Sequence, residues 1–536
     1  MPEAGSRTGA HNLARLAERA LERLGDHPSL YFEGAWHGSA DLAGRATRFG
    51  AGLVRLGVAP GDRVVVLMAN CPEVGIAYTG IWRAGAVATP VIFLVSATEL
   101  RYMLTDSGAV AVVTTAEFLP KVRAAAEGLP VRLVVVDGTD GTDDPEGPDD
   151  TASFAELEGA EPGSVVDRAD DDLAALLYTG GTTGRSKGVM ITHSNLCQGT
   201  AAIRQITHVP GVNRSLLPLP LSHAYGLMVT VAALHATEPG SAVLMRWFDP
   251  AGWISLVEQH RVQTCAMVPS MIAMLLAQPL EEHDLSSLYN VGCGAAPLPA
   301  AVALEFERRV PSATVLEGYG CTETSAVLSA MPPDARRLGT VGVPVPGVRV
   351  RVCDDDGVEL PTGQDGEILV CGPNITPGYW RDDEQTAAAF TDGWLHTGDI
   401  GRLDNDGYLT IVDRKKDLII RGGFNVFPRD VEEVLTSHPA VTSAVVVGRP
   451  DPRVGEEVVA FVAVLGPSAG VAPEELVDFA KARLTATKYP REVRIIDQIP
   501  LTSVGKPNRR ALRELVVAEQ RDPTQQQNVP GRAGAD

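Results

Sequence analysis

Short runs of β-branched residues alternate with stretches of helical periodicity through the first part of this sequence. The runs RVVVLMA (63–69), AVAVVTT (109–115), VRLVVVD (131–137) and LAALLYT (173–179) are typical of buried strands. Residues 10–25 place leucine and alanine at helical spacing, which predicts an amphipathic helix. Because alternating strands and helices pack in layers, we predict an α/β fold with a large N-terminal domain of layered α/β sheets.

The pattern changes after residue 340. VRVRVCDDDGVEL and GEILVCG predict antiparallel strands joined by turns, with DDDG as a turn signal, and we expect a small β-barrel-like subdomain there. Beyond Asp413, strands (SAVVVGR, VVAFVAVL, REVRIID) accompany one helix (PEELVDFAKARL). We expect these to form a small, mobile α+β C-terminal domain.

The predicted boundaries follow from these changes. We assign 1–413 to the large domain, with subdomains at 1–172, 173–340 and 341–413. A hinge at 414–416 precedes the small domain at 417–515. The polar tail at 516–536, which ends in QQQNVPGRAGAD, is expected to be disordered.

Composition limits the class of partner. The net charge is −21, which argues against nucleic acid or an anionic membrane as the main partner. The seven cysteines form no C-x-x-C pair, so neither a zinc site nor a disulfide framework is expected, and a reducing cytoplasm fits. The start of the chain has no secretory signal pattern, and the longest apolar stretch, 84–95, is too short to span a bilayer. We expect a cytoplasmic protein with no stable membrane insertion.

The stretch YTGGTTGRSKG (178–188) is suited to holding phosphate. Its glycines let backbone N–H groups approach an anion closely, its threonines add hydroxyl donors, and its lysine adds charge. It follows a predicted strand and precedes a predicted helix, HSNLCQGTAAI. A plain glycine-rich turn is the alternative, which the threonines and the lysine together disfavour. The candidate residues are Thr179, Gly180, Gly181, Thr182, Thr183, Gly184 and Lys187.

Four further motifs carry candidate chemistry. In EGYGCTETS (317–325) the Tyr319 ring can lie against a base and Glu323 can ligate Mg²⁺, although a helix cap is the alternative. In WLHTGDIG (394–401) a buried Asp399 in a turn can accept hydrogen bonds from a ribose diol, unless it only forms an Asx turn. DRKKDLIIRGGFNVFP (413–428) is basic and glycine-bearing, and is either a functional hinge or a solvated linker. LTSVGKPNRRALR (501–513) places Lys506 on a glycine-flanked loop, or is plain surface.

The order and spacing of these motifs resemble the adenylate-forming superfamily over about residues 10–515, and IIRGGFNVFPRDVEEVL most resembles its fatty-acyl-CoA synthetase branch. The resemblance implies two half-reactions. A carboxylate attacks the α-phosphorus of ATP, with Mg²⁺ bound, and gives an acyl-adenylate and pyrophosphate. The thiol of coenzyme A then takes the acyl group and releases AMP. Positioning and charge stabilisation dominate such chemistry.

The resemblance also implies roles for individual residues. Lys506 should bridge the carboxylate and the α-phosphate, with Thr182 and Thr322 near the phosphates. Asp399 and Arg414 should bind the ribose, Lys416 should act as the hinge residue, and His223 should lie at the mouth of the acyl pocket. A hydrogen-bonded core histidine is the alternative for His223. The adenine slot should be lined by Gly294, Ala295, Ala296 and Tyr319, with Gly318 and Gly320 also among the nucleotide-binding residues. The CoA tunnel should be bordered by Gly422 and Gly423.

Three positions depart from the family pattern. Gly180 replaces a serine, Ser186 replaces a proline, and Pro507 stands where an aliphatic residue is common. None removes a group on which adenylation depends, so we expect adenylation to survive. The two glycine-loop changes remove a phosphate donor and a source of rigidity.

The expected substrate is an acid without an α-amino group. Residues 218–230 contain no acidic side chain, and a buried ammonium without a partner is costly. HAYGLMVTVAAL and MVPSMIAMLL are apolar and Met-rich, which favours an adaptable hydrophobic pocket, or alternatively plain core. Fatty acids rank first and aryl or bulky polycyclic acids next. The alternatives are transfer to an acyl carrier protein or separate partner, and a catalytically weak nucleotide- or acyl-binding protein. The sequence leaves open whether the protein forms a homodimer.

Overall fold

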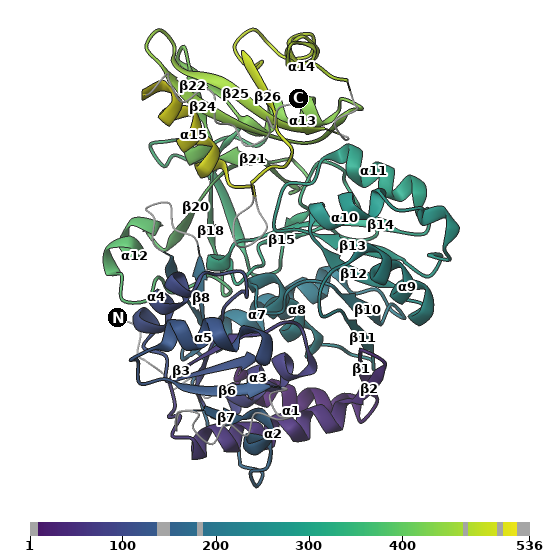
Figure 1. The fold of residues 1–536 in the computed structure, drawn as a ribbon, viewed down its shortest axis with the longest axis vertical. Helices are drawn as coiled ribbons and strands as arrows, with labels where there is room; N and C mark the ends of the chain where they lie inside the picture. Colours follow the sequence, from purple (N-terminus) through teal and green to yellow (C-terminus); the bar gives the residue numbers. More distant parts are fainter. Residues whose placement is uncertain (1–8, 137–150, 180–185, 465–469, 501–506, 522–536) are drawn as a thin grey trace, which may run out of the picture. The chain divides into compact units, whose positions relative to one another are not determined.

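The computed structural model describes residues 9–136, 151–179, 186–464, 470–500 and 507–521 (Figure 1). The contacts divide the chain into two compact units. The large unit comprises Met1–Val350 and Val370–Leu395, and the small unit comprises Arg351–Leu369 and His396–Asp536.

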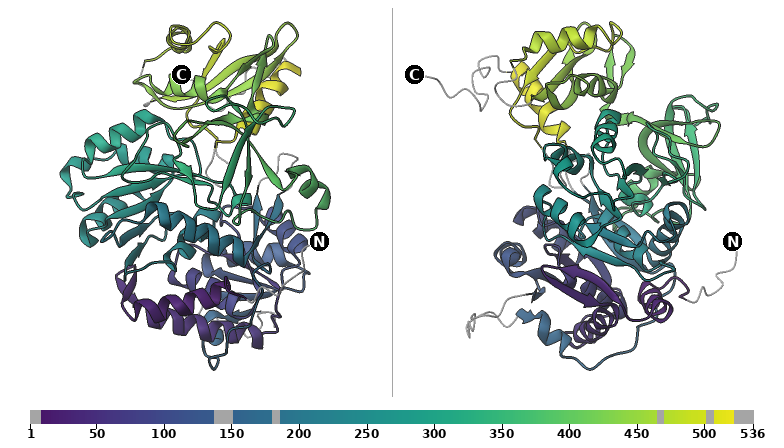
Figure 2. Two further views of the ribbon diagram at one scale, coloured as in Figure 1. Left: turned by 180° about the vertical axis from the view of Figure 1, so that it is seen from behind. Right: turned by 90° about the vertical axis from the view of Figure 1, so that its right-hand side faces the viewer.

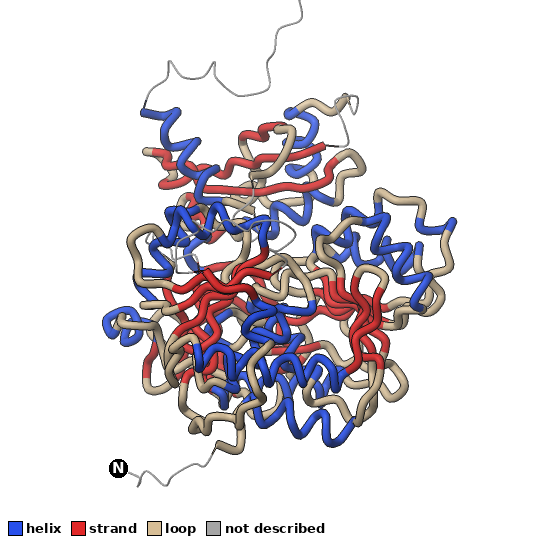
Figure 3. Tube along the Cα trace, turned by 60° about the horizontal axis from the view of Figure 1, so that its bottom comes forward, coloured by secondary structure: helices blue, strands red, loops and turns tan. Residues whose placement is uncertain are grey.

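One sheet of the large unit has seven strands and is parallel apart from its last member. Its order is β7 (Thr151–Ser153), β6 (Arg132–Val136), β5 (Ala111–Thr115), β3 (Arg63–Leu67), β4 (Val87–Pro90), β8 (Leu173–Thr179) and β9 (Lys187–Thr192). Only β9 runs antiparallel to its neighbour, β8. Figure 3 shows the strands of this unit in red among the helices that pack on them.

The second sheet of the large unit has nine strands. Its order is β16 (Val343–Pro344), β15 (Ser329–Ala330), β14 (Thr314–Tyr319), β13 (Asn290–Cys293), β12 (Thr264–Met267), β10 (Arg214–Leu217), β11 (Ser241–Leu244), β1 (Pro28–Phe32) and β2 (Ala35–Gly38). The strands from β14 to β1 in this order are parallel, and the edges pair antiparallel.

Helices occupy the connections between the strands of the large unit. They are α1 (Leu13–Leu24), α2 (Ser39–Arg55), α3 (Pro72–Arg83), α4 (Ala97–Ser107), α5 (Leu119–Ala126), α6 (Phe154–Glu158), α7 (His193–Thr207), α8 (Ala224–Ala233), α9 (Pro250–His260), α10 (Pro269–Leu276), α11 (Ala300–Arg309) and α12 (Asp383–Ala389), with 3-10 turns η1 (Ala116–Phe118), η2 (Leu280–Glu282) and η3 (Thr322–Thr324). Helices α1, α2 and α3 lie side by side (Figures 1 and 2).

The continuous apolar runs of the sequence reflect strands that are buried on both faces. In β3, Val64 and Val66 belong to one core cluster, together with Phe49 of α2. Val65 and Leu67 belong to another cluster, on the opposite face. Parallel strands covered by helices on both sides lose the polar alternation of a half-exposed strand. This explains why the predicted strands at 63–69, 109–115, 131–137 and 173–179 are found as β3, β5, β6 and β8, and the α/β fold class is confirmed.

The small unit contains a five-stranded sheet with helices. The sheet has the order β23 (Phe424–Val426), β22 (Ile419–Arg421), β25 (Gly455–Val464) and β24 (Val441–Asp451), with β26 (Glu492–Ile495) beside β25. The helices are η4 (Lys415–Asp417), α13 (Pro428–Thr436), α14 (Pro473–Lys481) and α15 (Arg509–Arg521). Residues 516–521, which the sequence assigned to the tail, therefore lie in α15.

A further sheet contains β17 (Arg349–Cys353), β18 (Gly366–Cys371), β20 (Trp394–Leu403), β19 (Phe390–Thr391) and β21 (Leu409–Arg414). The contacts group 351–369 and 396–413 with the C-terminal segment, whereas the sequence placed them in the large domain. A physical reason is visible at β21, where Arg429 of α13 donates to the carbonyl of Ile411 at 2.7 Å. The hinge at 414–416 stays a prediction.

Candidate active site

The glycine-rich stretch joins two paired strands. Thr179 at the end of β8 lies opposite Lys187 at the start of β9 in the antiparallel ladder. The predicted helix HSNLCQGTAAI is confirmed as α7, which begins at His193. The sequence did not predict that KGVMIT forms the strand β9 between the loop and this helix. The candidates Gly180, Gly181, Thr182, Thr183 and Gly184 lie outside the described residues.

Lys187 is held by two side chains from the segment that precedes and begins α12. Its Nζ donates to Oε1 of Gln385 at 2.5 Å and lies 5.0 Å from the centre of the Tyr379 ring. The backbones are joined too, because the N–H of Trp380 donates to the carbonyl of Gly188 at 2.7 Å. The ammonium is therefore fixed at the base of the hairpin.

Glu323 lies in η3, after β14, and its side chain contacts the same tyrosine. The Tyr379 hydroxyl donates to Oε1 of Glu323 at 3.0 Å. The backbone carbonyl of Glu323 accepts from the N–H of Thr376 at 2.8 Å. Burial, followed by the nearby Glu323 charge, raises the pKa of Tyr379 far above its usual value, so the phenol stays a proton donor.

The loop that carries Thr322 and Glu323 has a constrained backbone. A Cβ at Gly320 would lie 2.5 Å from the backbone of Ala326, so only glycine fits there. Ser325 and Ala326 have positive φ angles of 53° and 65°, a strained conformation for residues with a side chain. The Ser325 hydroxyl donates to the carbonyl of Asn374 at 2.8 Å, which holds the loop against the segment that contains Tyr379.

The predicted adenine-slot residues lie at the carboxyl ends of neighbouring parallel strands. Gly294, Ala295 and Ala296 follow β13, and Gly318 and Tyr319 end β14, with Cys293 paired to Glu317 in the register. A Cβ at Gly294 would lie 3.1 Å from the carbonyl oxygen of Gly318. The structure thus brings these two groups together at the sheet edge where open α/β sheets bind ligands.

His223 precedes α8 and caps it. Its Nδ1 accepts from the backbone N–H of Tyr225 at 3.2 Å, and the side chain is half-buried. In the neutral tautomer that this bond requires, Nε2 carries the proton. On the same helix, Tyr225 donates to the carbonyl of Gly292 at 3.4 Å, so α8 faces the strand that leads to the adenine-slot candidates.

The small unit holds the other polar pair. Asp399 on β20 lies directly opposite Arg414 on β21, and Nε of Arg414 is 3.2 Å from Oδ1 of Asp399. The aspartate side chain is 6 % exposed and the arginine side chain 49 %. The predicted turn at Asp399 was wrong. Gly398, with φ 70°, gives the segment its turn-like composition, but hydrogen bonding to β21 continues through Asp399.

Next to this pair the structure reveals Asp413, which the sequence analysis did not single out. It is buried, and its two oxygens accept the backbone N–H groups of Arg414 at 2.7 Å and Arg429 at 2.9 Å. Burial raises its pKa to about 6 despite these bonds. The predicted hinge residue Lys416 follows in η4, and Lys415 pairs with Glu367 at 3.0 Å.

Gly422 and Gly423 form the two-residue turn of the β22–β23 hairpin. Their φ angles are 59° and 81°, and a Cβ on either would meet no atom within 4 Å. The backbone conformation therefore requires glycine here, as two-residue hairpin turns do. The Gly422 N–H donates to the carbonyl of Val454 at 2.6 Å.

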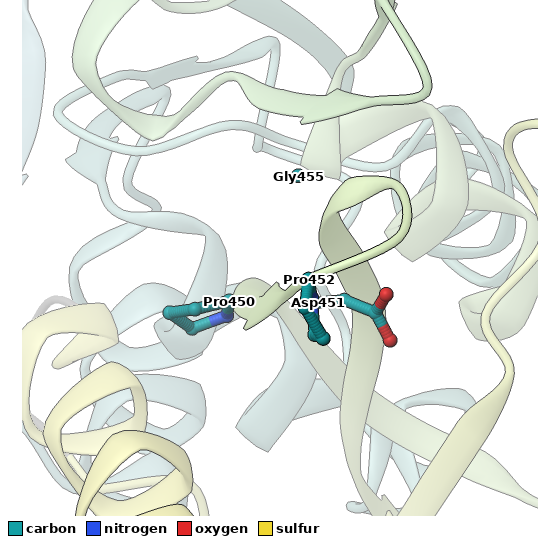
Figure 4. A pocket seen from close by; sticks show the side chains of 4 residues that line it. All are labelled: Pro450, Asp451, Pro452 and Gly455. Atoms are coloured by element: carbon teal, nitrogen blue, oxygen red, sulfur yellow. The ribbon is translucent and has the colours of Figure 1, made fainter.

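That bond joins the turn to the tip of the β24–β25 hairpin. A shallow depression at this tip is lined by Pro450, Asp451, Pro452 and Gly455, and the side chains of Pro450 and Asp451 point in opposite directions (Figure 4). Oδ1 of Asp451 accepts the backbone N–H groups of Arg453 at 2.8 Å and Val454 at 3.3 Å, so this carboxylate serves the turn.

Within the described ranges, no group of three or more histidine, cysteine, aspartate and glutamate side chains is arranged to hold a metal ion. A single carboxylate such as Glu323 still fits Mg²⁺, because this ion keeps several waters and binds proteins through one or two carboxylates plus substrate phosphates. In the same ranges no helix combines the length and apolar character that a bilayer crossing requires. Lys506 lies outside the described residues.

Comparisons with known proteins identify the family of this chain. Residues 17–380 match the family model of AMP-binding enzymes, and residues 430–506 match the C-terminal domain of AMP-binding enzymes. A feruloyl-CoA synthase from Amycolatopsis sp is 37 % identical, over 87 % of this chain and 91 % of that protein. A long-chain-fatty-acid–CoA ligase from Bacillus subtilis is 34 % identical, over 92 % of each.

Among solved structures, ATP-bound MatB from Rhodopseudomonas palustris superposes with a TM-score of 0.84 at 33 % identity, covering 94 % of this chain and 98 % of that one. The family match and these identities extend over most of the chain. The chain therefore belongs to the adenylate-forming family of AMP-binding enzymes, in the branch of the AMP-forming acid–CoA ligases.

Proposed function

We propose that the enzyme activates a hydrophobic carboxylic acid of the fatty, aryl or bulky acyl class to an acyl-adenylate and passes the acyl group to coenzyme A. The names of two relatives refer to a feruloyl group, which is aryl, and to a long-chain fatty acyl group, and neither acid has an α-amino group. The apolar segments of this chain favour the same class of acid.

The observation that carries the choice of acid is the composition of residues 218–230, which lead into α8. They contain no acidic side chain that would hold a substrate ammonium. Leu227, Met228 and Val231 are buried in the core, so they are not available to a ligand. Ala224, Tyr225 and Val229 are half-buried and are the apolar side chains that we assign to the acyl pocket.

The first half-reaction needs two anions brought together. A carboxylate oxygen forms a bond to the α-phosphorus while the bond from that phosphorus to the bridging oxygen breaks, and pyrophosphate leaves with the electron pair. We assign Lys506 to the meeting point of carboxylate and α-phosphate, Thr182 and Thr322 to the phosphates, and Glu323 to Mg²⁺. Bound Mg²⁺ would supply positive charge to the phosphate oxygens.

The nucleotide's other parts are assigned to the sheet edges. Gly294, Ala295, Ala296, Gly318, Tyr319 and Gly320 would line the adenine, and Asp399 with Arg414 would bind the ribose hydroxyls. An Asp–Arg pair is close to neutral overall, so it can hydrogen-bond a diol without attracting a second cation. His223 would lie at the mouth of the acyl pocket, and its position as the cap of α8 is compatible with this role.

The second half-reaction is assigned to the small unit's glycine turn. The thiolate sulfur of coenzyme A forms a bond to the acyl carbon while the bond from that carbon to the phosphate oxygen of AMP breaks, and AMP leaves with the electron pair. Lys416 would be the hinge residue about which Lys506 withdraws, and Gly422 and Gly423 would border the pantetheine arm. An acyl carrier protein as the acceptor is the second candidate, since the same adenylate serves either thiol.

One assay set tests the proposal. ATP–pyrophosphate exchange is measured over long-chain, aryl and amino acids, and thioester formation is then measured with CoA and with a carrier protein. We expect exchange with apolar acids and thioester formation with CoA. No exchange with any acid would exclude the adenylating function, and exchange without CoA transfer would select the carrier protein. Lys506→Ala should reduce exchange far more than thioester formation from supplied acyl-adenylate, and equal losses would contradict its role.

A further inference from the structure

Tyr379 connects three parts of the large unit that are distant in the sequence. It lies between β18 and α12, and its side chain is 9 % exposed. Its hydroxyl reaches Glu323, and the Lys187 ammonium lies against its ring. Its own backbone is fixed, since its N–H donates to the Thr386 hydroxyl at 2.9 Å and it forms a bridge to Val189 of β9.

The segment around Tyr379 also holds the main chain of Glu323. Thr376 donates its N–H to the Glu323 carbonyl, and its hydroxyl donates to the carbonyl of Met190 at 2.5 Å. Gly378 has φ 142°, and a Cβ there would lie 2.4 Å from the Thr386 side chain. These contacts fix the backbone of residues 376–379. This segment in turn holds Glu323 through hydrogen bonds to both its backbone carbonyl and its side-chain carboxylate.

The chemistry of the donor decides what the carboxylate can still do. A neutral phenol fixes the orientation of the carboxylate but does not cancel its charge, unlike an arginine or lysine. Among the described residues no ion pair of Glu323 with a lysine or arginine is found, and Lys187 contacts the ring instead. A carboxylate that is oriented but still carries its charge is suited to a divalent cation, because hydrogen bonds to ligating carboxylates orient them for the metal.

We propose that Tyr379 is a positioning residue that holds the Glu323 carboxylate for the metal and the Lys187 ammonium for the phosphates of the same nucleotide. This inference rests on the proposed function, in which Glu323 binds Mg²⁺. In this role Tyr379 acts through Glu323 and Lys187. It couples the metal ligand to the base of the glycine-rich hairpin through one ring, with the hydroxyl on Glu323 and the face on Lys187.

The variant Tyr379→Phe tests the hydroxyl alone, because the ring and its contact with Lys187 remain. Nucleotide binding is measured by titration calorimetry with ATP plus Mg²⁺ and with ATP plus EDTA, and Mn²⁺ binding to the ATP complex is measured by electron paramagnetic resonance. We expect the Kd for ATP with Mg²⁺ to rise about 10-fold, as for other partners of metal ligands. The Kd without metal should stay unchanged. These readouts are independent of turnover.

Tyr78→Phe is the matched control. Tyr78 is fully buried in the same unit, and its hydroxyl donates to the carbonyl of Leu221 at 3.0 Å. The substitution removes the same atom from a buried tyrosine, so it reproduces the structural cost. We expect it to leave the difference between metal-bound and metal-free ATP affinity unchanged. An equal loss of metal-dependent affinity in both variants would overturn the positioning role.

Glu323→Gln separates this inference from the function on which it rests. If Glu323→Gln leaves the Mg²⁺ dependence of ATP binding intact, the assignment of Glu323 to the metal fails. If Glu323→Gln abolishes that dependence and Tyr379→Phe does not weaken it, only the role of Tyr379 is overturned. We expect the double variant to bind metal–ATP no more weakly than Glu323→Gln alone, since both changes act through one carboxylate. Additive losses would contradict that.

Discussion

The two units present their candidate carboxylates in opposite electrostatic states. Glu323 in the large unit receives its hydrogen bond from a neutral phenol, at 3.0 Å. Asp399 in the small unit is paired with an arginine, at 3.2 Å. The first carboxylate keeps its negative charge for a cation, whereas the charge of the second is compensated and its oxygens remain hydrogen-bond acceptors. Under the proposed assignments, the partner of each carboxylate, more than its burial, would distinguish the metal ligand Glu323 from the ribose ligand Asp399.

The largest effect is expected from removing the uncompensated charge. Glu323→Gln keeps an acceptor for Tyr379 but removes the charge, so we expect the ATP–pyrophosphate exchange rate to fall about 100-fold, in line with the loss of one preorganised electrostatic group. The rate should also become less dependent on Mg²⁺ concentration, which is measured by titrating the metal in the exchange assay.

Glu305→Gln is the control for this variant. Glu305 lies on α11 and pairs with Arg308 at the surface, with side chains 44 % and 67 % exposed. Removing this charge changes the net charge equally, but exposed pairs contribute little. A similar loss of exchange in both variants would mean that net charge, and not the position of Glu323, controls the rate.

The strands and the candidate site residues illustrate what the sequence could and could not predict. Buried parallel strands such as β3 were predictable because their apolar runs are continuous. The strand β9 was missed because KGVMIT directly follows a glycine-rich loop and is short. Tyr379 was missed because its hydrogen bond joins residues 56 positions apart and exists only in the folded chain. Asp399 was placed in a turn because Gly398 precedes it, whereas pairing with β21 is a tertiary property.

The next effect concerns buried polar groups in the large unit. His193 at the start of α7 is 0 % exposed, and its Nδ1 accepts the backbone N–H of Leu13 at 3.2 Å. Burial, followed by the charge of Arg168, lowers its pKa to about 4, although Asp170 and Asp172 act in the other direction. The unfolded chain therefore binds this proton at higher pH than the folded chain does. The contribution of His193 to stability is complete above about pH 6.5 and is lost as the pH falls towards 4.

We expect the free energy of unfolding of the large unit to drop by about 3 kcal/mol over this range because of His193. All six tryptophans lie within the large unit's residue ranges, so denaturant unfolding followed by tryptophan fluorescence reports on this unit. In His193→Asn, which keeps an acceptor near Nδ1, the drop should be smaller by that amount. An unchanged pH dependence in the variant would show that other groups cause it.

A smaller effect is expected at the compensated pair. Asp399→Asn leaves Arg414 without its counter-charge and replaces one acceptor by a donor, so we expect the Kd for ATP to rise about 10-fold, the cost of one charged hydrogen bond. Unlike the change at Glu323, the loss should be the same with and without Mg²⁺. Asp365→Asn breaks an exposed pair with Arg402 in the same unit and should leave ATP binding unchanged. A loss in Asp399→Asn that requires Mg²⁺ would break the distinction between the two carboxylates.

The smallest effect tests why the small unit has a glycine at its hairpin turn. Gly422→Ala places a Cβ at φ 59° in open space, so only backbone strain opposes it, at about 1–2 kcal/mol. Gly407→Ala is the matched control, because Gly407 has φ 82° with equally open surroundings in the turn between β20 and β21. Hydrogen exchange of the small unit should report similar destabilisation in both variants. Thioester formation from supplied acyl-adenylate should fall only in Gly422→Ala if the turn borders the pantetheine arm. Equal rates of thioester formation in the two variants would contradict a role for Gly422 beside the pantetheine arm. The backbone strain that both variants share would then explain why a glycine is required at this position.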